Sequence, residues 1–316
     1  MKVLVTGATG LIGRNLCRAL AAADHHIVAL SRAPEKAKGL NAATVYKWDG
    51  IAGPPPVAAL QGINSVVNLA GEPIADHRWS PEQKKRIRDS RVISTRNLVE
   101  GLRQEGTKPA SLVSGSAVGF YGDREDEILD ENSPAGRGFL SDVCSEWEEE
   151  AERASSLGVR VVRVRTGVVL SATGGALKKM LPAFKLGIAG RLGSGRQWLP
   201  WIHIIDLVSI LHCALLSNSL SGPINATAPE PARNSDFTRE LAHVLRRPAV
   251  LPLPSFALHL MMGEMSEILL GGQRAIPKAL EQSGFEFRFR TLSPALEDLL
   301  GRKNTTETYH GKAADV

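Results

Sequence analysis

The stretch Val3-Leu4-Val5-Thr6-Gly7-Ala8-Thr9-Gly10-Leu11-Ile12-Gly13 combines a strand pattern, a glycine-rich turn and the start of a helix, in that order. In such a turn the first glycine lets the chain leave the strand sharply, the second lets the backbone approach a pyrophosphate, and the third lets the helix pack close to the sheet. The N–H groups at the start of the helix then face the phosphates. The stretch predicts a dinucleotide-binding turn rather than a tight turn without a ligand. The residues expected to line the phosphates are Gly7, Thr9, Gly10, Leu11, Ile12 and Gly13.

The first half of the chain continues the alternation of short aliphatic runs with helical patterns, which is typical of βαβ units that build a parallel sheet. The expected strands are 2–6, 26–31, 44–48, 65–69, 110–115 and 159–165. The clearest helix is 81–105, because Ser80 can cap it, Pro81 suits its first turn and Gln83 can complete a capping box. The pattern predicts an α/β protein with a doubly wound parallel sheet of the Rossmann type.

After about residue 170 this rhythm weakens, which predicts a second region built differently from the first. We expect a dinucleotide-binding domain over 1–170, and then the last sheet elements with a smaller C-terminal cap over 171–303. A late helix should begin at Ser293-Pro294. Residues 304–316 are polar and are expected to form a flexible tail.

Composition narrows the function classes. Lys and Arg exceed Asp and Glu by 38 to 33 without a dense basic run, so we expect no nucleic-acid partner. The three cysteines show neither CxxC nor Cys/His spacing, so we expect no metal site and a reducing compartment. Charged residues and prolines interrupt the most apolar region, 251–270, so no membrane span is expected. The N-terminus enters a strand without a leader pattern, which favours the cytoplasm.

The end of the second strand bears on the choice of nicotinamide cofactor. NAD enzymes usually place Asp or Glu there to accept from the ribose 2′-hydroxyl, whereas this chain has Ser31 and Arg32. A guanidinium can stack on adenine and donate to a 2′-phosphate, and Arg14 is a second candidate cation. The sequence therefore favours NADP(H) over NAD, unless Arg32 is only a solvated loop residue. Asp49 follows the third strand and is either an adenine contact or a turn residue before Gly50.

Several further motifs carry a family resemblance, and they are spread over nearly the whole chain. They are Asn68-Leu69-Ala70-Gly71-Glu72, Arg78-Trp79, Ser90-Arg91, Thr95-Arg96-Asn97-Leu98, Arg165-Thr166-Gly167-Val168-Val169-Leu170 and Pro200-Trp201-Ile202-His203. Together with the GxxGxxG turn they resemble the epimerase-family branch of the atypical extended short-chain dehydrogenases/reductases. The resemblance implies a Rossmann core with NADP(H), a cofactor contact at Leu69, Ala70, Gly71 and Glu72, and a small C-terminal domain over about 251–300. It implies no particular substrate.

The chain departs from that superfamily at the catalytic pair, which is normally a Tyr followed four residues later by a Lys. The Lys and the oxidised nicotinamide lower the pKa of the Tyr, which then acts as general acid or base. Gly50, Glu125 and Ala313 follow the three tyrosines at that spacing, so the pair is absent. On the helix that carries this pair in other members, the resemblance puts Leu140 at about the Tyr position and Cys144 at about the Lys position. Cys144 is expected to be a packing residue rather than a reactive thiol.

Ser116 ends the fifth strand and matches the position whose hydroxyl contacts the reacting oxygen of the substrate in active relatives. It is the one catalytic residue we expect, and the alternative is a serine that hydrogen-bonds the backbone. Tyr121 resembles a loop tyrosine that shapes the pocket.

Four more residues are candidates for the substrate pocket. Arg78 and Trp79 could hold an anionic or ring-bearing ligand, or could anchor their loop to the helix 81–105. Trp201 and His203 lie in the late loop, and aliphatic neighbours favour a core position for His203 over an acid/base role.

Two functions remain open from the sequence. The first is an NADP(H)-dependent oxidoreductase or epimerase that acts on a small polar metabolite with a carbonyl or hydroxyl carbon, with Ser116 orienting the oxygen. The second is a non-catalytic NADP(H)-binding sensor, which the missing Tyr–Lys pair favours. The cations of helix 81–105 are spread over several faces and indicate a solvated surface, although a homodimer could also form along this helix.

Overall fold

The computed structural model describes residues 1–42 and 44–301. Its centre is a seven-stranded parallel sheet in the order β11-β7-β5-β4-β1-β2-β3. The strands of this sheet are β1 Lys2–Thr6, β2 His26–Ser31, β3 Thr44–Lys47, β4 Ser65–Asn68, β5 Ser111–Ala117, β7 Arg160–Thr166 and β11 Gly222–Ala226. The doubly wound Rossmann-type fold expected from the sequence is therefore confirmed.

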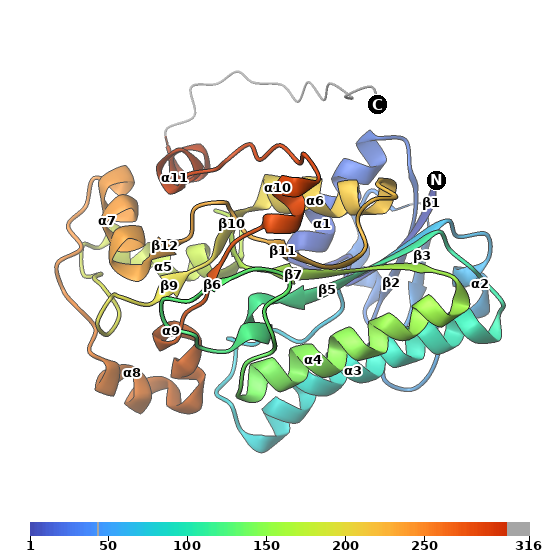
Figure 1. Cartoon of the computed structure of the whole chain (residues 1–316), viewed down its shortest axis with the longest axis horizontal. Helices are drawn as coiled ribbons and strands as arrows, with labels where there is room; N and C mark the ends of the chain where they lie inside the picture. Colours follow the sequence, from blue (N-terminus) through green and yellow to red (C-terminus); the bar gives the residue numbers. More distant parts are fainter. Residues whose placement is uncertain (43, 302–316) are drawn as a thin grey trace.

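Helices cover both faces of the sheet, and shorter strands lie beyond its carboxyl edge (Figure 1). The helices are α1 Leu11–Ala22, α2 Val57–Leu60, α3 Pro81–Gln104, α4 Phe139–Glu152, α5 Gly175–Lys185, α6 Ile204–Leu216, α7 Asn234–Leu245, α8 Ser255–Met262, α9 Glu267–Leu270, α10 Lys278–Gln282 and α11 Leu292–Leu300. The short strands are β6 Ile128–Leu129, β8 Val168–Leu170, β9 Trp198–Leu199, β10 Trp201–His203, β12 Ala232–Arg233 and β13 Arg274–Ala275.

The sheet strands are buried on both faces, which explains their continuous apolar runs. Val3 and Val5 pack in one core with α1 and α6, whereas Leu4 and Val28 pack in another core with α3. Successive side chains of a strand point to opposite faces, so each strand supplies both cores. Figure 1 shows α3 and α4 side by side along one face, with α1 and α6 on the other.

The chain reverses direction across the sheet between β1 and β4. From β1 it moves outward through β2 and β3, and it then returns to place β4 on the other side of β1. A crevice opens at such a point beyond the carboxyl ends of the two strands, and α/β proteins bind their ligands there. The topology therefore places the candidate site at the residues that follow Thr6 and Asn68.

The C-terminal region has a core of its own. Trp201 from β10, Phe237 from α7 and Phe289 pack together there, and Leu296 of α11 joins them. The parallel pair β8–β10, the antiparallel pair β9–β12 and the parallel pair β6–β13 tie this region to the loops at the carboxyl edge of the sheet.

Most of the predicted strands and helices begin and end within two residues of the observed ones. The hydroxyl of Ser80 accepts a hydrogen bond from the Gln83 N–H at the start of α3, as expected. The other half of the capping box is not formed, because the Ser80 N–H donates to the Arg78 carbonyl. The expected tail 304–316 lies outside the described residues. Among the described helices, none is both long and apolar enough to span a membrane.

Candidate functional site

The glycine-rich turn packs directly against the loop that follows β4. A Cβ on Gly7 would lie 2.5 Å from the Leu69 carbonyl oxygen, and Gly7 has a φ of +65°, so a side chain is excluded by space and by backbone conformation. A Cβ on Gly13 would lie 2.3 Å from the Gly7 carbonyl oxygen. Both glycines are therefore required for the close contact of β1, α1 and the β4 loop at the switch point.

The start of α1 presents unpaired donors. Gly10 is its capping residue and has no side-chain acceptor to offer, and the first turn contains no acidic residue. Within the described chain, the N–H groups of Leu11, Ile12 and Gly13 have no hydrogen-bond acceptor. Such a helix start, with its positive dipole end, suits a phosphate group. The turn thus has the shape and the donors that a pyrophosphate needs.

One hydroxyl holds the other wall of this crevice. Thr6 Oγ1 accepts from the backbone N–H groups of Leu69 and Ala70, at 3.0 and 3.1 Å, and donates to Asn68 Oδ1 at 2.7 Å. Asn68 in turn donates to Thr95 Oγ1 on α3 at 2.8 Å. This buried network fixes Leu69, Ala70 and the following Gly71 beside the glycine-rich turn.

The end of β2 carries the groups expected near the adenine ribose. The Ser31 hydroxyl is buried and accepts from the Ala33 N–H at 3.2 Å. Arg32 is largely exposed and pairs with Glu72 at 3.3 Å, so its guanidinium reaches from β2 toward the β4 loop. Arg14 donates to the carbonyl oxygens of Thr9 and Lys36, at 2.9 and 2.7 Å. Two arginines therefore lie around the glycine-rich turn, and β2 itself ends without a carboxylate, although that of Glu72 approaches Arg32 from the β4 loop.

Asp49 lies in a turn. Its Oδ1 accepts from the N–H groups of Ile51 and Ala52, and these bonds hold the pKa of its carboxyl below the usual range. Both interpretations of Asp49 are compatible with this geometry, because the second carboxylate oxygen takes no part in the turn.

Ser116 is part of a buried ionic network. Its hydroxyl donates to Glu148 Oε1 on α4 at 2.7 Å, and Arg165 on β7 holds the same carboxylate with two hydrogen bonds of 2.8 and 2.9 Å. All three side chains are almost fully buried. Because the proton of Ser116 points to Glu148, its oxygen is left to accept a hydrogen bond from a ligand hydroxyl.

Tyr121 closes the far side of the same network. Its hydroxyl accepts from Arg165 Nη1 at 3.0 Å and donates to Asn225 Oδ1 at 2.7 Å. The Arg165 guanidinium also lies 3.6 Å from the centre of the Phe120 ring. Burial raises the pKa of Tyr121. Its hydroxyl is thus committed to holding β7, β11 and the segment after β5 together, rather than lining an open pocket.

Arg78 and Trp79 lie in the loop between β4 and α3, which faces the C-terminal region. The Trp79 indole donates to the Ile74 carbonyl at 2.8 Å and meets the Phe139 ring edge-on at 5.1 Å. Arg78 is exposed and approaches the Leu260 carbonyl of α8 at 3.4 Å. Both residues anchor this loop, and Arg78 keeps a guanidinium accessible to a ligand.

Trp201 and His203 are buried completely. The Trp201 indole donates to the Glu230 carbonyl at 2.9 Å, and His203 Nδ1 accepts from the Ile205 N–H at the start of α6. His203 Nε2 lies 3.2 Å from Asp298 Oδ2, without the alignment of a hydrogen bond. Burial lowers the pKa of His203 to about 4. These contacts favour packing for both residues, which for His203 is the interpretation that its aliphatic neighbours in the sequence favour.

Three site residues were not among the sequence candidates: Glu148, Arg165 and Arg91. The two members of the ion pair come from α4 and β7, and nothing in the sequence indicates that they meet. Arg91 leaves a signal, because it follows Ile87 and precedes Thr95 by one helical turn each, and both of those residues are buried. A cation on the buried stripe of a helix was therefore visible in the sequence.

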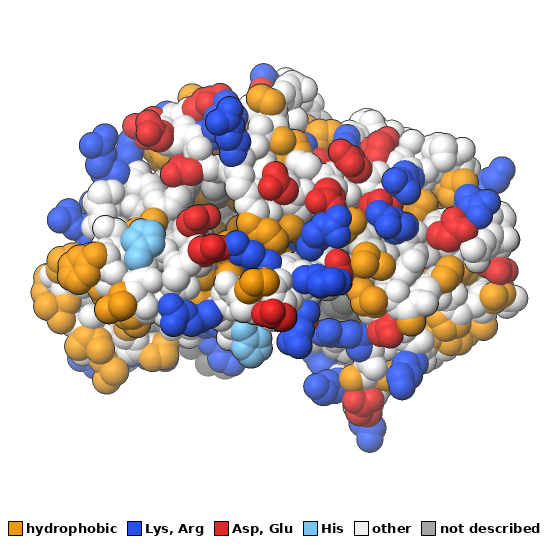
Figure 2. All heavy atoms as spheres, turned by 90° about the horizontal axis from the view of Figure 1, so that it is seen from below, with side chains coloured by type: hydrophobic (Ala, Val, Ile, Leu, Met, Phe, Trp, Pro, Cys, Tyr) orange, Lys and Arg blue, Asp and Glu red, His pale blue; other side chains and the backbone are white. Residues whose placement is uncertain are grey.

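The surface of α3 agrees with a solvated helix. Five of its cations pair with carboxylates: Lys84 with Glu264, Lys85 with Asp89, Arg88 with Glu146, Arg96 with Glu150 and Arg103 with Glu100. Figure 2 shows acidic and basic side chains intermixed over this face, with hydrophobic side chains gathered at the end where α8 lies. The described residues contain no cluster of His, Cys, Asp and Glu suited to a metal ion.

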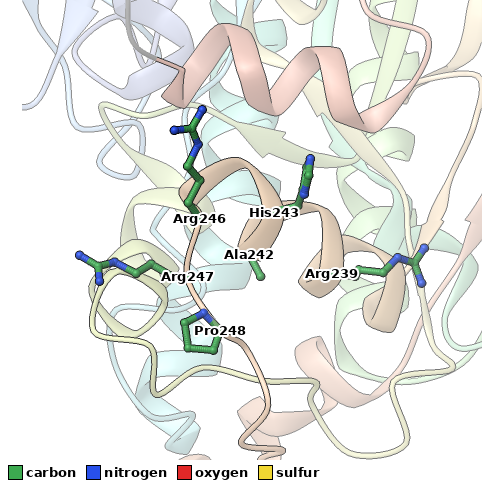
Figure 3. Close-up of a pocket in the computed structure, with 6 residues that line it drawn as sticks. All are labelled: Arg239, Ala242, His243, Arg246, Arg247 and Pro248. Carbon is green, nitrogen blue, oxygen red and sulfur yellow. The ribbon is translucent and has the colours of Figure 1, made fainter.

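A hollow of about 630 Å³ lies at the C-terminal end of α7. It is lined by Arg239, Ala242, His243, Arg246, Arg247 and Pro248 (Figure 3). The three arginines point in different directions, and Arg239 is paired with Asp236 at 3.0 Å. The hollow therefore has no converging set of groups, and the crevice between β1 and β4 remains the candidate site.

Comparisons with known proteins agree with this architecture. The model of the NAD dependent epimerase/dehydratase family matches residues 3–226, and that of a domain of unknown function, DUF1731, matches residues 253–299. The chain is 43% identical to the epimerase family protein SDR39U1 homolog, chloroplastic, of Arabidopsis thaliana, over 95% of this chain and 87% of that protein. It is 36% identical to the epimerase family protein YfhF of Bacillus subtilis, over 96% of this chain and 100% of that protein.

Among solved structures, the human epimerase family protein SDR39U1 (isoform 2), crystallised with NADPH, superimposes with a TM-score of 0.84 at 35% identity, over 95% of this chain and 99% of that one. The family model covers well over half of the chain, and it includes the glycine-rich turn, the β4 loop and Ser116. The chain belongs to the NAD-dependent epimerase/dehydratase family.

Proposed function

We propose that this protein binds NADP(H) in the crevice between β1 and β4 and acts as an oxidoreductase or epimerase on a small polar metabolite. The observation that carries the proposal is the pairing of two features: a helix start with free N–H donors, and an adjacent β2 end that has Arg32 in place of an acid. The first suits a pyrophosphate and the second a 2′-phosphate. The human relative, which is 35% identical, was crystallised with NADPH, and this supports the assignment.

The residues present fit this cofactor. Gly7, Gly10 and Gly13 keep the turn free of side chains, and Arg32 and Arg14 supply positive charge at the adenine end. When bound, NADP(H) supplies or takes up a hydride at its nicotinamide.

Ser116 is the proposed substrate contact. Its hydroxyl oxygen would accept a hydrogen bond from the hydroxyl form of the substrate, because its own proton is directed at Glu148. The proton that accompanies the hydride would be exchanged with water or with a pocket group not yet assigned. Arg78 and Trp79, in the loop that faces the C-terminal region, are the proposed substrate-pocket residues.

A second function has a specific observation in its favour. The family resemblance aligns Leu140 and Cys144, both on α4, with the superfamily's Tyr and Lys, and burial raises the pKa of the Cys144 thiol to about 11. Leu140 has no ionisable group and the Cys144 thiol stays neutral at pH 7, so these residues supply neither the phenol nor the cation of the usual pair. A sensor that binds NADP(H) without chemistry is the alternative function.

The test is to supply the protein with NADPH, add fractionated cell extract and follow the absorbance of the reduced nicotinamide, with NADH as control. An oxidoreductase is expected to cause a loss of absorbance with NADPH but not with NADH. Ser116→Ala should abolish this loss without changing the affinity for NADPH. Tight NADPH binding without loss in any fraction points to the sensor or to an epimerase that returns the hydride. Absence of NADPH binding would refute both functions.

A further inference from the structure

The α4 helix supplies no cation to the site. Cys144 occupies the expected lysine position, is buried and stays neutral, because burial raises the pKa of its thiol. The thiol lies near Ser116, and close enough to Arg91 for that charge to act on it. Any positive charge at this point must therefore come from another element.

Arg91 reaches this point from α3. The position that a Cβ on Gly71 would occupy lies 3.0 Å from the Arg91 Cζ and 3.1 Å from its Nη2. Nη2 donates to the Glu72 carbonyl at 3.0 Å and Nη1 donates to the Ile87 carbonyl at 3.0 Å. The guanidinium also lies 5.5 Å from the centre of the Trp147 ring. Its position against the β4 loop is thus well defined.

Among the residues that the structure describes, Arg91 forms no ion pair. Within the described chain no carboxylate oxygen lies within 4.0 Å of its nitrogens, and its Nε–H donates to no described group. Burial lowers the pKa of this guanidinium. By contrast, neighbouring cations on the same helix, such as Arg88 and Arg96, are half exposed and pair with glutamates. A half-buried cation that no carboxylate neutralises leaves its exposed edge free to bind an anionic or hydroxyl-bearing ligand.

The strand order indicates which part of a ligand would do so. Arg32 follows β2, on one side of β1, whereas Gly71 follows β4 and Ser116 lies at the end of β5, on the other side. A dinucleotide that lies across the switch point places its adenine half over the first group and its nicotinamide half over the second. Arg91 belongs to the second group.

We propose that Arg91 is the cation of the nicotinamide half of the cofactor site, and that it supplies from α3 the positive charge that α4 lacks at Cys144. The inference rests on the proposed NADP(H) binding and adds a residue to it. Its Nε–H and the exposed edge of its guanidinium would contact the ribose hydroxyls or phosphate of that half.

The test compares two ligands by calorimetry: NADPH, and 2′,5′-ADP, which lacks the nicotinamide half. Arg91→Gln keeps donors but removes the charge, and should weaken NADPH binding about 10- to 100-fold while leaving 2′,5′-ADP affinity within about twofold. Arg88→Gln, on the same helix but paired with Glu146 at the surface, is the matched control and should leave both affinities unchanged.

Two further variants keep the test decisive if Arg91→Gln fails to fold, as judged by circular dichroism. Arg91→Lys retains a charge with less reach and should weaken NADPH alone, and Cys144→Lys added to Arg91→Gln should restore part of the lost NADPH affinity. The inference would be overturned if a folded Arg91→Gln or Arg91→Lys variant bound NADPH as tightly as the unmutated protein does. It would also be overturned if a folded variant lost affinity for NADPH and for 2′,5′-ADP by the same factor. Failure of the unmutated protein to bind either ligand would instead overturn the proposed function.

Discussion

The ion pair between Arg165 and Glu148 should contribute strongly to stability, because both side chains are 4% exposed. Breaking such a pair by removing one partner leaves a buried charge, which costs about 3–5 kcal/mol. Glu148 keeps two other contacts in an Arg165→Met variant: the Ser116 hydroxyl, and Arg163 Nη1 at 3.8 Å. We therefore expect the lower end of that range, about 3 kcal/mol, for Arg165→Met.

Replacing the other partner, Glu148, should lower the free energy of unfolding by less than Arg165→Met does. In Glu148→Gln the amide oxygen can still accept from Arg165, and the guanidinium keeps the Tyr121 hydroxyl, the Glu131 carbonyl and the Phe120 ring. Removing both charges together leaves no unpaired ion, so the double variant should be more stable than the sum of the single effects predicts. We expect a coupling free energy of about 1–3 kcal/mol.

The assay is urea unfolding followed by circular dichroism, with the free energy of unfolding compared at equal slope of the transition. Arg163→Met is the control, because Arg163 is partly exposed and its contacts with Glu148 and Glu152 are loose, at 3.8 and 3.4 Å. It should lower stability by less than about 1 kcal/mol. A loss below about 1 kcal/mol for Arg165→Met, or purely additive effects in the double variant, would refute the idea of a buried, mutually dependent pair.

Two more predictions concern the cofactor and pH. Arg32→Gln should weaken NADPH binding about 10- to 100-fold and leave NADH binding unchanged in the same titration, because only NADPH carries the 2′-phosphate; equal effects on the two would contradict the assignment of Arg32. His203 has its pKa lowered by burial from 6.5 to about 4, so the unfolded chain binds the proton first and stability should fall as pH drops from 6.5 to 4. This contribution to the free energy of unfolding is at most about 3 kcal/mol. It should disappear in His203→Asn, which keeps a capping acceptor for α6. If plots of the free energy of unfolding against pH run parallel for the two proteins, His203 makes no such contribution.

The sheet could be predicted from the sequence because its information is local. A glycine-rich turn, runs of β-branched residues and a capped helix each act over a few neighbours, and the predicted strand 2–6 and helix 81–105 reappear as β1 and α3 with almost the same bounds. The phosphate-facing turn is equally local, since its strand, its glycines and its helix start are contiguous.

The polar centre could not be predicted in the same way. Ser116 was visible as the end of a strand, but its partner Glu148 lies 32 positions later and Arg165 a further 17. The sequence predicts that Tyr121 shapes the pocket, whereas in the structure its hydroxyl donates to Asn225, which lies 104 positions away. Such pairs depend on the sheet order and on the packing of α4 against β5 and β7, and no spacing in the chain encodes them.

The sequence by itself therefore determined the fold class, the place of the nucleotide-binding turn, the basic end of β2 and the missing Tyr–Lys pair. Only the tertiary structure decided how far each charge is shielded from solvent and what it faces: Arg165 is buried with a carboxylate partner, and Arg91 is half-buried beside Gly71 with no carboxylate partner among the described residues. The physical reason is that the free energy of a charge depends on its solvent exposure and its neighbours in space, and chain folding brings those neighbours from distant parts of the sequence.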